Sequence, residues 1–220
     1  MTALPALLAL ALQAAPRDTV AVRLVESVPP GMGSSAAALG EPSLHIRTGQ
    51  GAASIWLLRT RDSAFVIART SDSTYYWGDD LVISLDVSGD RGTVPGHDDF
   101  QWYFRRALDS SVVYRGRGGR WEAPRGDPDW RLGASREGGG WTVASRSEAA
   151  GWWVVLRLDG AWLLGEAGRR PGIAFRVYDD SPGGWFAWPV PAGVRQPAGV
   201  EKVPDLWGVV GAEEEGGMSP

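Results

Sequence analysis

Glycine and proline interrupt this chain so often that long helices have no room to form. Its 220 residues include 30 glycines and 15 prolines, and no amphipathic stretch exceeds about ten residues, which is short for a helix. Both residue types break helices and mark turns. The sequence therefore predicts an all-β fold: an antiparallel β-sandwich of the jelly-roll or immunoglobulin-like kind, in a single domain.

Short apolar runs separated by Gly, Asp, Ser and Pro follow one another from Ser43 onward. Many short strands at such regular spacing are typical of a sandwich. The predicted strands are 43–47, 53–60, 64–71, 81–87, 100–107, 111–115, 141–146, 152–159, 172–179, 185–190 and 206–210.

Several of these segments alternate apolar and polar residues, and alternate residues of a strand point to opposite faces of the sheet. Segment 100–105 is the clearest case, and 152–158 and 173–178 behave in the same way. In the first segment we expect one face to carry Phe100, Trp102 and Phe104 and the other to carry Gln101, Tyr103 and Arg105.

The N-terminus has the pattern of a secretion signal. Residues 3–12 form an apolar run too short to span a bilayer, and the small residues Ala14 and Ala15 follow it. We expect a signal peptide over residues 1–15 and a secreted, periplasmic or cell-envelope location. A short amphipathic or disordered leader is the alternative interpretation.

The remaining boundaries follow from composition. Residues 16–42 include a stretch rich in Pro, Gly, Ser and Ala, which indicates a connector or an edge segment. The sandwich is expected over 43–211, with a long polar loop at 116–140. Residues 212–220 contain three consecutive glutamates and are expected to be a disordered acidic tail.

Charge and cysteine content exclude several classes of function. The net charge is −4 and the chain has no cysteine. A weakly acidic protein is not expected to bind nucleic acid. A chain without cysteine has no disulfide, no thiolate nucleophile and no Cys-ligated metal.

Tryptophan is unusually frequent, with 12 residues against five Tyr and five Phe. Each indole offers a broad flat ring and one N–H donor, and such a ring can stack on the apolar C–H face of a pyranose sugar. We expect about two thirds of the tryptophans to fill the core of the β-fold. We expect two or three of the others to form a binding site.

The densest polar region holds Asp79, Asp80, Asp86, Asp90 and the 97–99 segment His-Asp-Asp. Three interpretations remain open: solvated carboxylates at strand ends, a structural Ca²⁺ site, and acid–base catalysis. No zinc-binding pattern and no GxSxG motif is present. No catalytic constellation stands out, and the chain is not expected to be an enzyme.

Residues 60–86, TRDSAFVIARTSDSTYYWGDDLVISLD, resemble family-9 carbohydrate-binding modules and the wider DOMON-like sandwich group. Further similar segments follow in the family's order over residues 43–211. The matching positions in the first segment are Asp62, 65–67, Asp72, Trp77 and 79–86. The later segments are 98–102, 151–158, 172–180, 188–189 and 204–210.

The resemblance implies a β-sandwich that holds a sugar between two tryptophans. Trp77 matches the first, but residues 190–199 contain no Trp where the family has the second, so Trp185 or Trp188 would have to replace it. Two polar sugar contacts of the family are also changed, with Val82 in place of Glu and Tyr103 in place of Arg.

The expected function is therefore a secreted, non-catalytic domain that binds an oligo- or polysaccharide. The alternative is a cell-envelope interaction or structural domain, with a protein partner, that keeps the sandwich and has lost the sugar site. Trp77 would stack on the ligand, with Asp79 and Asp80 at the rim. The expected ligand-binding residues are Trp77, Asp79, Asp80, Gln101, Tyr103, Arg105, Trp185 and Trp188.

Overall fold

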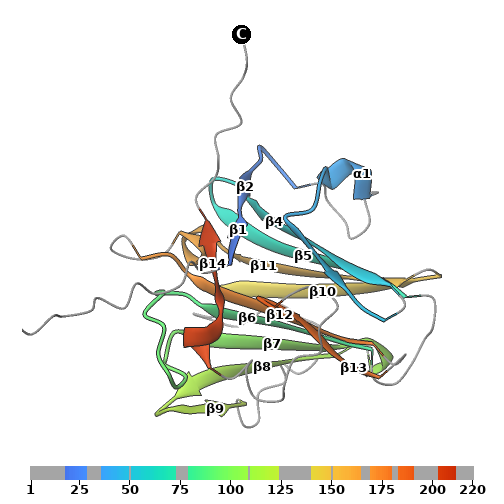
Figure 1. Ribbon diagram of the computed structural model, residues 1–220. Helices are drawn as coiled ribbons and strands as arrows, with labels where there is room; N and C mark the ends of the chain where they lie inside the picture. Colours follow the sequence, from blue (N-terminus) through green and yellow to red (C-terminus); the bar gives the residue numbers. More distant parts are fainter. Residues whose placement is uncertain are drawn as a thin grey trace, which may run out of the picture.

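The protein is a sandwich of two β-sheets, which Figure 1 shows as stacked layers. The computed structural model describes residues 18–28, 36–49, 51–72, 79–108, 110–123, 140–149, 151–164, 169–179, 183–190 and 203–211. The predicted β-sandwich is confirmed. Trp77 and the segments 1–17, 124–139 and 212–220 lie outside the described residues.

The large sheet has eight strands, in the order β1-β14-β12-β6-β7-β8-β9, with β13 paired to β12. Its strands are β1 (Thr19–Ala21), β6 (Asp80–Asp86), β7 (Asp99–Arg105), β8 (Ser110–Arg117), β9 (Arg120–Glu122), β12 (Gly172–Asp179), β13 (Gly184–Trp188) and β14 (Gly208–Gly211).

The small sheet has six strands, in the order β10-β11-β5-β4-β2, with β3 paired to β4. Its strands are β2 (Arg23–Leu24), β3 (Leu44–Arg47), β4 (Ala52–Arg59), β5 (Ser63–Ser71), β10 (Trp141–Glu148) and β11 (Gly151–Asp159).

Helical structure within the described ranges is confined to single turns. The α-helix α1 covers Ala36–Leu39, and three 3₁₀ turns cover Arg106–Leu108 (η1), Gly160–Leu163 (η3) and Pro204–Leu206 (η5). None of the described helices is long and apolar enough to cross a membrane.

The first strands of the chain belong to both sheets. β1 pairs in parallel with β14, and β2 pairs in parallel with β4, whereas the other described pairs are antiparallel. Residues 18–24, which the sequence places in a connector or edge segment, therefore supply an edge strand of the large sheet and an end strand of the small one.

The main core lies between the two sheets. It contains one alternate set of side chains from each long strand, including Trp102 and Phe104 of β7, Phe175 of β12 and Leu156 of β11. The predicted alternation is confirmed in these strands. The opposite set of β7, with Tyr103 and Arg105, therefore points to the outer face of the large sheet.

A second apolar cluster covers the outer face of the small sheet. Trp56 and Trp153 stack there at 5.7 Å between ring centroids, and Leu39 of α1 packs with them. The indole N–H of Trp56 donates to the carbonyl of Gly40 at 2.8 Å. The segment around α1 thus closes this face of the sandwich.

The described tryptophans divide between the core and partly exposed positions. Trp56, Trp102, Trp141, Trp152, Trp153 and Trp207 are buried, and Trp121, Trp162, Trp185 and Trp188 are half-buried.

Candidate functional site

The outer face of the large sheet carries the largest group of aromatic and charged side chains that the sequence analysis singled out. Tyr103 of β7 lies beside Val82 of β6, and Val82 lies beside Arg176 of β12. Because side chains that are opposite each other in a register share a face, all three project away from the core. Trp185 of β13 joins them through its register partner Tyr178.

Trp185 is the centre of an aromatic cluster on this face. Its ring meets the ring of Tyr103 edge-on at 6.1 Å between centroids, and that of Tyr178 at 5.5 Å. The guanidinium of Arg176 lies 4.3 Å from the Trp185 centroid, which is cation–π geometry. One face of the indole is therefore occupied by Arg176. Val82 lies on the strand between Tyr103 and Arg176 and is buried.

Asp80 joins Tyr103 and Arg105 in a polar network at one end of the face. The Tyr103 hydroxyl donates a hydrogen bond to Asp80 Oδ2, and Arg105 Nε donates to Asp80 Oδ1 at 3.2 Å. Arg105 Nη2 also donates to the Tyr103 oxygen at 3.3 Å. The three side chains hold one another in place, so the polar groups are pre-arranged.

Burial sets the protonation of this network. It raises the pKa of Asp80 above the ordinary value, and the hydrogen bonds from Tyr103 and Arg105 oppose that shift only in part. Burial, together with the hydrogen bond to Asp80, raises the pKa of Tyr103 to about 12. Tyr103 is therefore a neutral hydroxyl donor throughout the physiological range.

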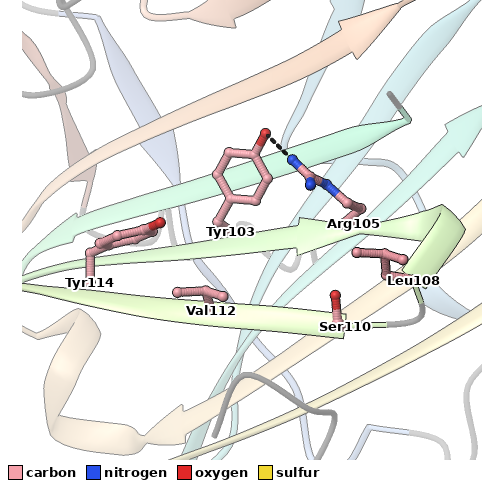
Figure 2. Close-up of a pocket in the computed structure, with 6 residues that line it drawn as sticks. All are labelled: Tyr103, Arg105, Leu108, Ser110, Val112 and Tyr114. Carbon is pink, nitrogen blue, oxygen red and sulfur yellow. Dashed lines mark hydrogen bonds between the residues drawn. The ribbon is translucent and has the colours of Figure 1, made fainter. Parts of the chain in front are cut away.

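A hollow of about 410 Å³ opens on the β7–β8 side of Tyr103. Figure 2 shows Tyr103 and Arg105 on one strand, Ser110, Val112 and Tyr114 on the next, and Leu108 at the connection between them. The register explains this arrangement, because Tyr103 pairs with Val112 and Arg105 pairs with Ser110. The size is that of a small-molecule site.

The other predicted ligand residues lie in different surroundings. Gln101 is on the same face but is buried, and its amide donates to Ser84 Oγ at 3.1 Å. Trp188 pairs with Phe175 and packs against the core, so it projects to the opposite side of the sheet from Trp185. Trp77 lies outside the described residues, and so does any clamp that it forms.

Asp79 is buried in an ion pair, whereas the sequence placed it at the rim of the ligand site. Arg106 Nη1 lies 3.0 Å from Asp79 Oδ2, and both side chains are almost fully buried. Arg106 also donates to the carbonyl of Gly151 at 3.3 Å. The pair therefore ties the start of β6 to the β10–β11 hairpin of the small sheet.

Sequence reasoning missed the β8 side of the hollow. Val112 and Tyr114 lie in the predicted strand 111–115, and their alternation was a usable signal. Their alignment with Tyr103 depends on where the chain reverses, and η1 sets that point. Leu108, in that turn, carries no pattern that marks it in the sequence.

A second cluster, of carboxylates, lies at the other end of β6 and β7. Asp86 and Asp99 are cross-strand partners, and together with Asp98 they bring carboxylate oxygens within 4.8 Å of one another. Of the acidic residues that the sequence grouped together, these three converge, while Asp79 and Asp80 lie at the opposite strand end.

Backbone amides hold this carboxylate cluster in place. Asp86 accepts from the N–H of Gly89 at 2.7 Å and of Arg91 at 2.9 Å, and Asp99 Oδ2 accepts from Gly96 at 2.6 Å. Asp99 Oδ1 is buried and has no hydrogen-bond partner among the described residues. Burial, with the charges of Asp86 and Asp98, raises the pKa of Asp99 to about 8.

Solved structures with this arrangement of sheets include two of a family-9 carbohydrate-binding module from Caldicellulosiruptor kristjanssonii. The one in complex with glucose has 15% sequence identity and a TM-score of 0.54, over 92% of this chain and 100% of that one. The one in complex with cellotriose has 16% identity and a TM-score of 0.56, over 92% and 98%. The chain has the fold of a family-9 carbohydrate-binding module.

This confirms, at the level of fold, the resemblance to family-9 modules drawn from the ordered motifs of residues 43–211. No protein-family model and no curated protein sequence matches the chain. In this fold Tyr103 and Arg105 lie on the outer face of the large sheet.

Proposed function

We propose that this protein is a non-catalytic carbohydrate-binding domain whose ligand lies on the outer face of the large sheet, against Tyr103 and Arg105. The observation that carries the proposal is the hollow of about 410 Å³ beside these two residues, with Asp80 holding both in place. The two solved structures of the same fold, which contain glucose and cellotriose, support a sugar as the ligand class.

The physical requirements of sugar binding fit this face. A hydroxyl that binds a protein group gives up a hydrogen bond to water, so hydroxyl contacts alone contribute little net affinity. Aromatic surface supplies the additional free energy, and a few polar groups set the orientation. Tyr103 and Tyr114 offer rings at the hollow, and Arg105 and Ser110 offer donors.

Trp77 and Trp185 are proposed to hold the sugar unequally, because only part of the Trp185 ring is exposed to a ligand. Arg176 covers one face of the Trp185 ring. Trp185 therefore packs against Tyr103 and contacts a ligand only with the exposed part of its ring. Trp77 keeps its proposed stacking role. With Trp188 turned toward the core, the Trp185 alternative is the one that fits the site.

The non-catalytic assignment rests on how the carboxylates at this end of the sheet are used. Asp80 is bonded to Tyr103 and Arg105, and Asp79 is paired with Arg106. Each of these carboxylates is engaged with an arginine and serves the fold or the site's geometry. We further propose a secreted or cell-envelope location, on the basis of the apolar run at residues 3–12.

Titration calorimetry with glucose and cellotriose tests the carbohydrate site. Tyr103→Ala removes the ring that faces the hollow and should weaken binding at least about tenfold, which corresponds to a loss of about 1.4 kcal/mol. Trp77→Ala should weaken it as well. Leu164→Ala is the control, because Leu164 is an exposed side chain that follows η3 and does not line the hollow.

A protein that binds neither these sugars nor any member of a glycan array would contradict the carbohydrate proposal. The alternative would then be a cell-envelope interaction domain. Two observations favour that alternative, because they reduce the aromatic and polar surface open to a sugar. Arg176 covers one face of the Trp185 indole, and a buried Val82 stands where the family has a Glu.

We also propose that Asp86, Asp98 and Asp99 bind a structural Ca²⁺ ion. Ca²⁺ prefers clusters of carboxylate and carbonyl oxygens, and the buried Asp99 Oδ1 that lacks a hydrogen-bond partner among the described residues is suited to become a ligand. The backbone of residues 89–96 packs around the same carboxylates. An ion here would hold that loop against the sheet.

The calcium proposal predicts a cation-dependent melting temperature. At a Ca²⁺ concentration of 100 times Kd, binding stabilises the fold by about 2.7 kcal/mol, which raises Tm by roughly 5–10 °C in a domain of this size. Scanning calorimetry in CaCl₂ and in EDTA measures the shift. Asp99→Asn should abolish this shift in Tm. Asp62→Asn should leave the shift unchanged, because Asp62 is exposed and lies outside the cluster. Equal Tm values in calcium and chelator would refute the site.

A further inference from the structure

The hollow beside Tyr103 has an apolar floor, formed by Leu108 and Val112. Leu108 is 50% exposed there, and Val112 lies on the strand that pairs with Tyr103. Figure 2 shows the rings of Tyr103 and Tyr114 above the same strand pair, with Val112 between Tyr114 and Ser110.

Most polar groups of the hollow are gathered at one end, and the exception is the hydroxyl of Tyr114. Arg105 and Ser110 are register partners at the start of β8, and Asp80 and the Tyr103 hydroxyl lie beside Arg105. Toward Tyr114 the lining changes to Val112 and aromatic ring. A ligand held at Arg105 therefore extends over Val112, which offers no hydrogen bond.

An unmodified sugar ring can lay its apolar C–H face on Tyr103, but the hydroxyl groups at its edge are poorly matched to Val112 and Leu108. Its hydroxyl groups would leave water above Val112 and Leu108 without gaining a protein partner, which is unfavourable. An acetyl or methyl group in the same place removes apolar surface from water on both sides. A volume of about 410 Å³ also falls in the range of sites for small molecules, whose walls are mostly apolar.

Building on the carbohydrate site proposed above, we propose that the hollow selects sugars with an apolar substituent, and O-acetylated sugars in particular. The sugar ring lies against Tyr103, and the acetyl methyl contacts Val112 and Leu108. The acetyl carbonyl accepts a hydrogen bond from Ser110 or Arg105 at the polar end. Val112 and Leu108 are thus the residues that determine specificity.

Calorimetric titration of the full-length protein with partially O-acetylated cellotriose, and with the same trisaccharide after alkaline deacetylation, tests this selection. The acetylated form should bind at least about tenfold more tightly. Val112→Thr has almost the same shape but places a hydroxyl in the floor, and it should reduce the ratio of the two affinities toward one. Leu108→Gln should act in the same direction.

Leu164→Gln is the matched control for Leu108→Gln, because Leu164 directly follows a 3₁₀ turn, as Leu108 ends one, and is 55% exposed. This variant should keep the full preference for the acetylated form. Circular dichroism and Tm show whether each variant is folded, and the affinity ratio within one variant is independent of how much protein is active.

The possible failures are distinguishable. Equal affinity for the two forms would overturn the selection and leave the carbohydrate site standing. A preference that survives in both Val112→Thr and Leu108→Gln would overturn the assignment to this hollow. If neither trisaccharide binds to the folded wild type, the proposed function fails and this inference fails with it.

Discussion

Tyr103 links every part of the candidate site through one side chain. Its ring meets Trp185 and forms a wall of the hollow, and its hydroxyl bonds to Asp80. The resemblance to family-9 modules places an Arg at this position and a Glu at its cross-strand neighbour, Val82. The two differences are therefore coupled: a large ring now lies next to the position where the acidic side chain is missing.

Asp80 makes the stability of the protein depend on pH. Burial raises its pKa above the ordinary value of 3.8, so the folded protein holds a proton that the unfolded chain has already released. The unfolding free energy therefore falls as pH rises from about 4 through the raised pKa. Asp80→Asn does not titrate, so relative to wild type this variant should gain stability over that interval.

Urea unfolding of wild type and Asp80→Asn at several pH values measures this difference, with chelator present at each pH. Asp62→Asn serves as the control, since Asp62 is exposed. If the wild-type and Asp80→Asn free energies ran parallel with pH, the argument from burial of Asp80 would be wrong.

At the scale of single strands, side-chain alternation decides the energetic role of each residue. In β11, Leu156 fills the core between the sheets while its neighbour Arg157 points outward. Leu156→Ala should cost about 2–5 kcal/mol of unfolding free energy, because the cavity remains after the side chain is removed.

Arg157→Ala is the neighbouring control and should cost only about 1 kcal/mol, since it loses two part-buried hydrogen bonds that share one acceptor, Ser63 Oγ. Chemical denaturation of both variants compares them directly. Similar costs for the two substitutions would contradict the assignment of faces in β11.

The same alternation explains how much could be predicted from the sequence. The faces of 100–105, 152–158 and 173–178 were predictable because each strand is long enough to show a period of two. β1 and β2 contain three and two residues, which is too short for any period. Their pairing depends on distant strands, and the sequence carries no local signal of it.

From alternation alone, the candidate site was predictable only within one strand, while Asp80 and Trp185 were expected from the resemblance to family-9 modules. Tyr103 and Arg105 follow from alternation in β7, whereas Val112 and Tyr114 join them only through the β7–β8 register. The convergence of Asp86 with Asp99 likewise requires the β6–β7 pairing. Contacts across strands depend on register, and turns whose geometry the sequence does not reveal set the register here.

At the scale of the whole molecule, the N-terminal segment connects the two layers. β1 extends the large sheet beside β14, β2 lies beside β4 of the small sheet, and α1 packs over Trp56 and Trp153. Arg23 donates to the carbonyl of Glu41 at 3.3 Å and also bonds the carbonyl of Leu39. These contacts make residues 18–28 and 36–41 a structural part of the sandwich.

A chain that begins at Ser43 should therefore be much less stable than one that begins at Pro16. The shorter chain loses β1 and β2, and it exposes Trp56 and Trp153, whose uncovered rings should bind hydrophobic dyes. The loss should be at least about 3 kcal/mol, on the scale of removing one large buried side chain. Urea midpoints and dye fluorescence of the two proteins measure it, with the intact chain as reference. If the chain from Ser43 unfolded at the same midpoint, the N-terminal segment would be an independent connector and the domain would begin at residue 43.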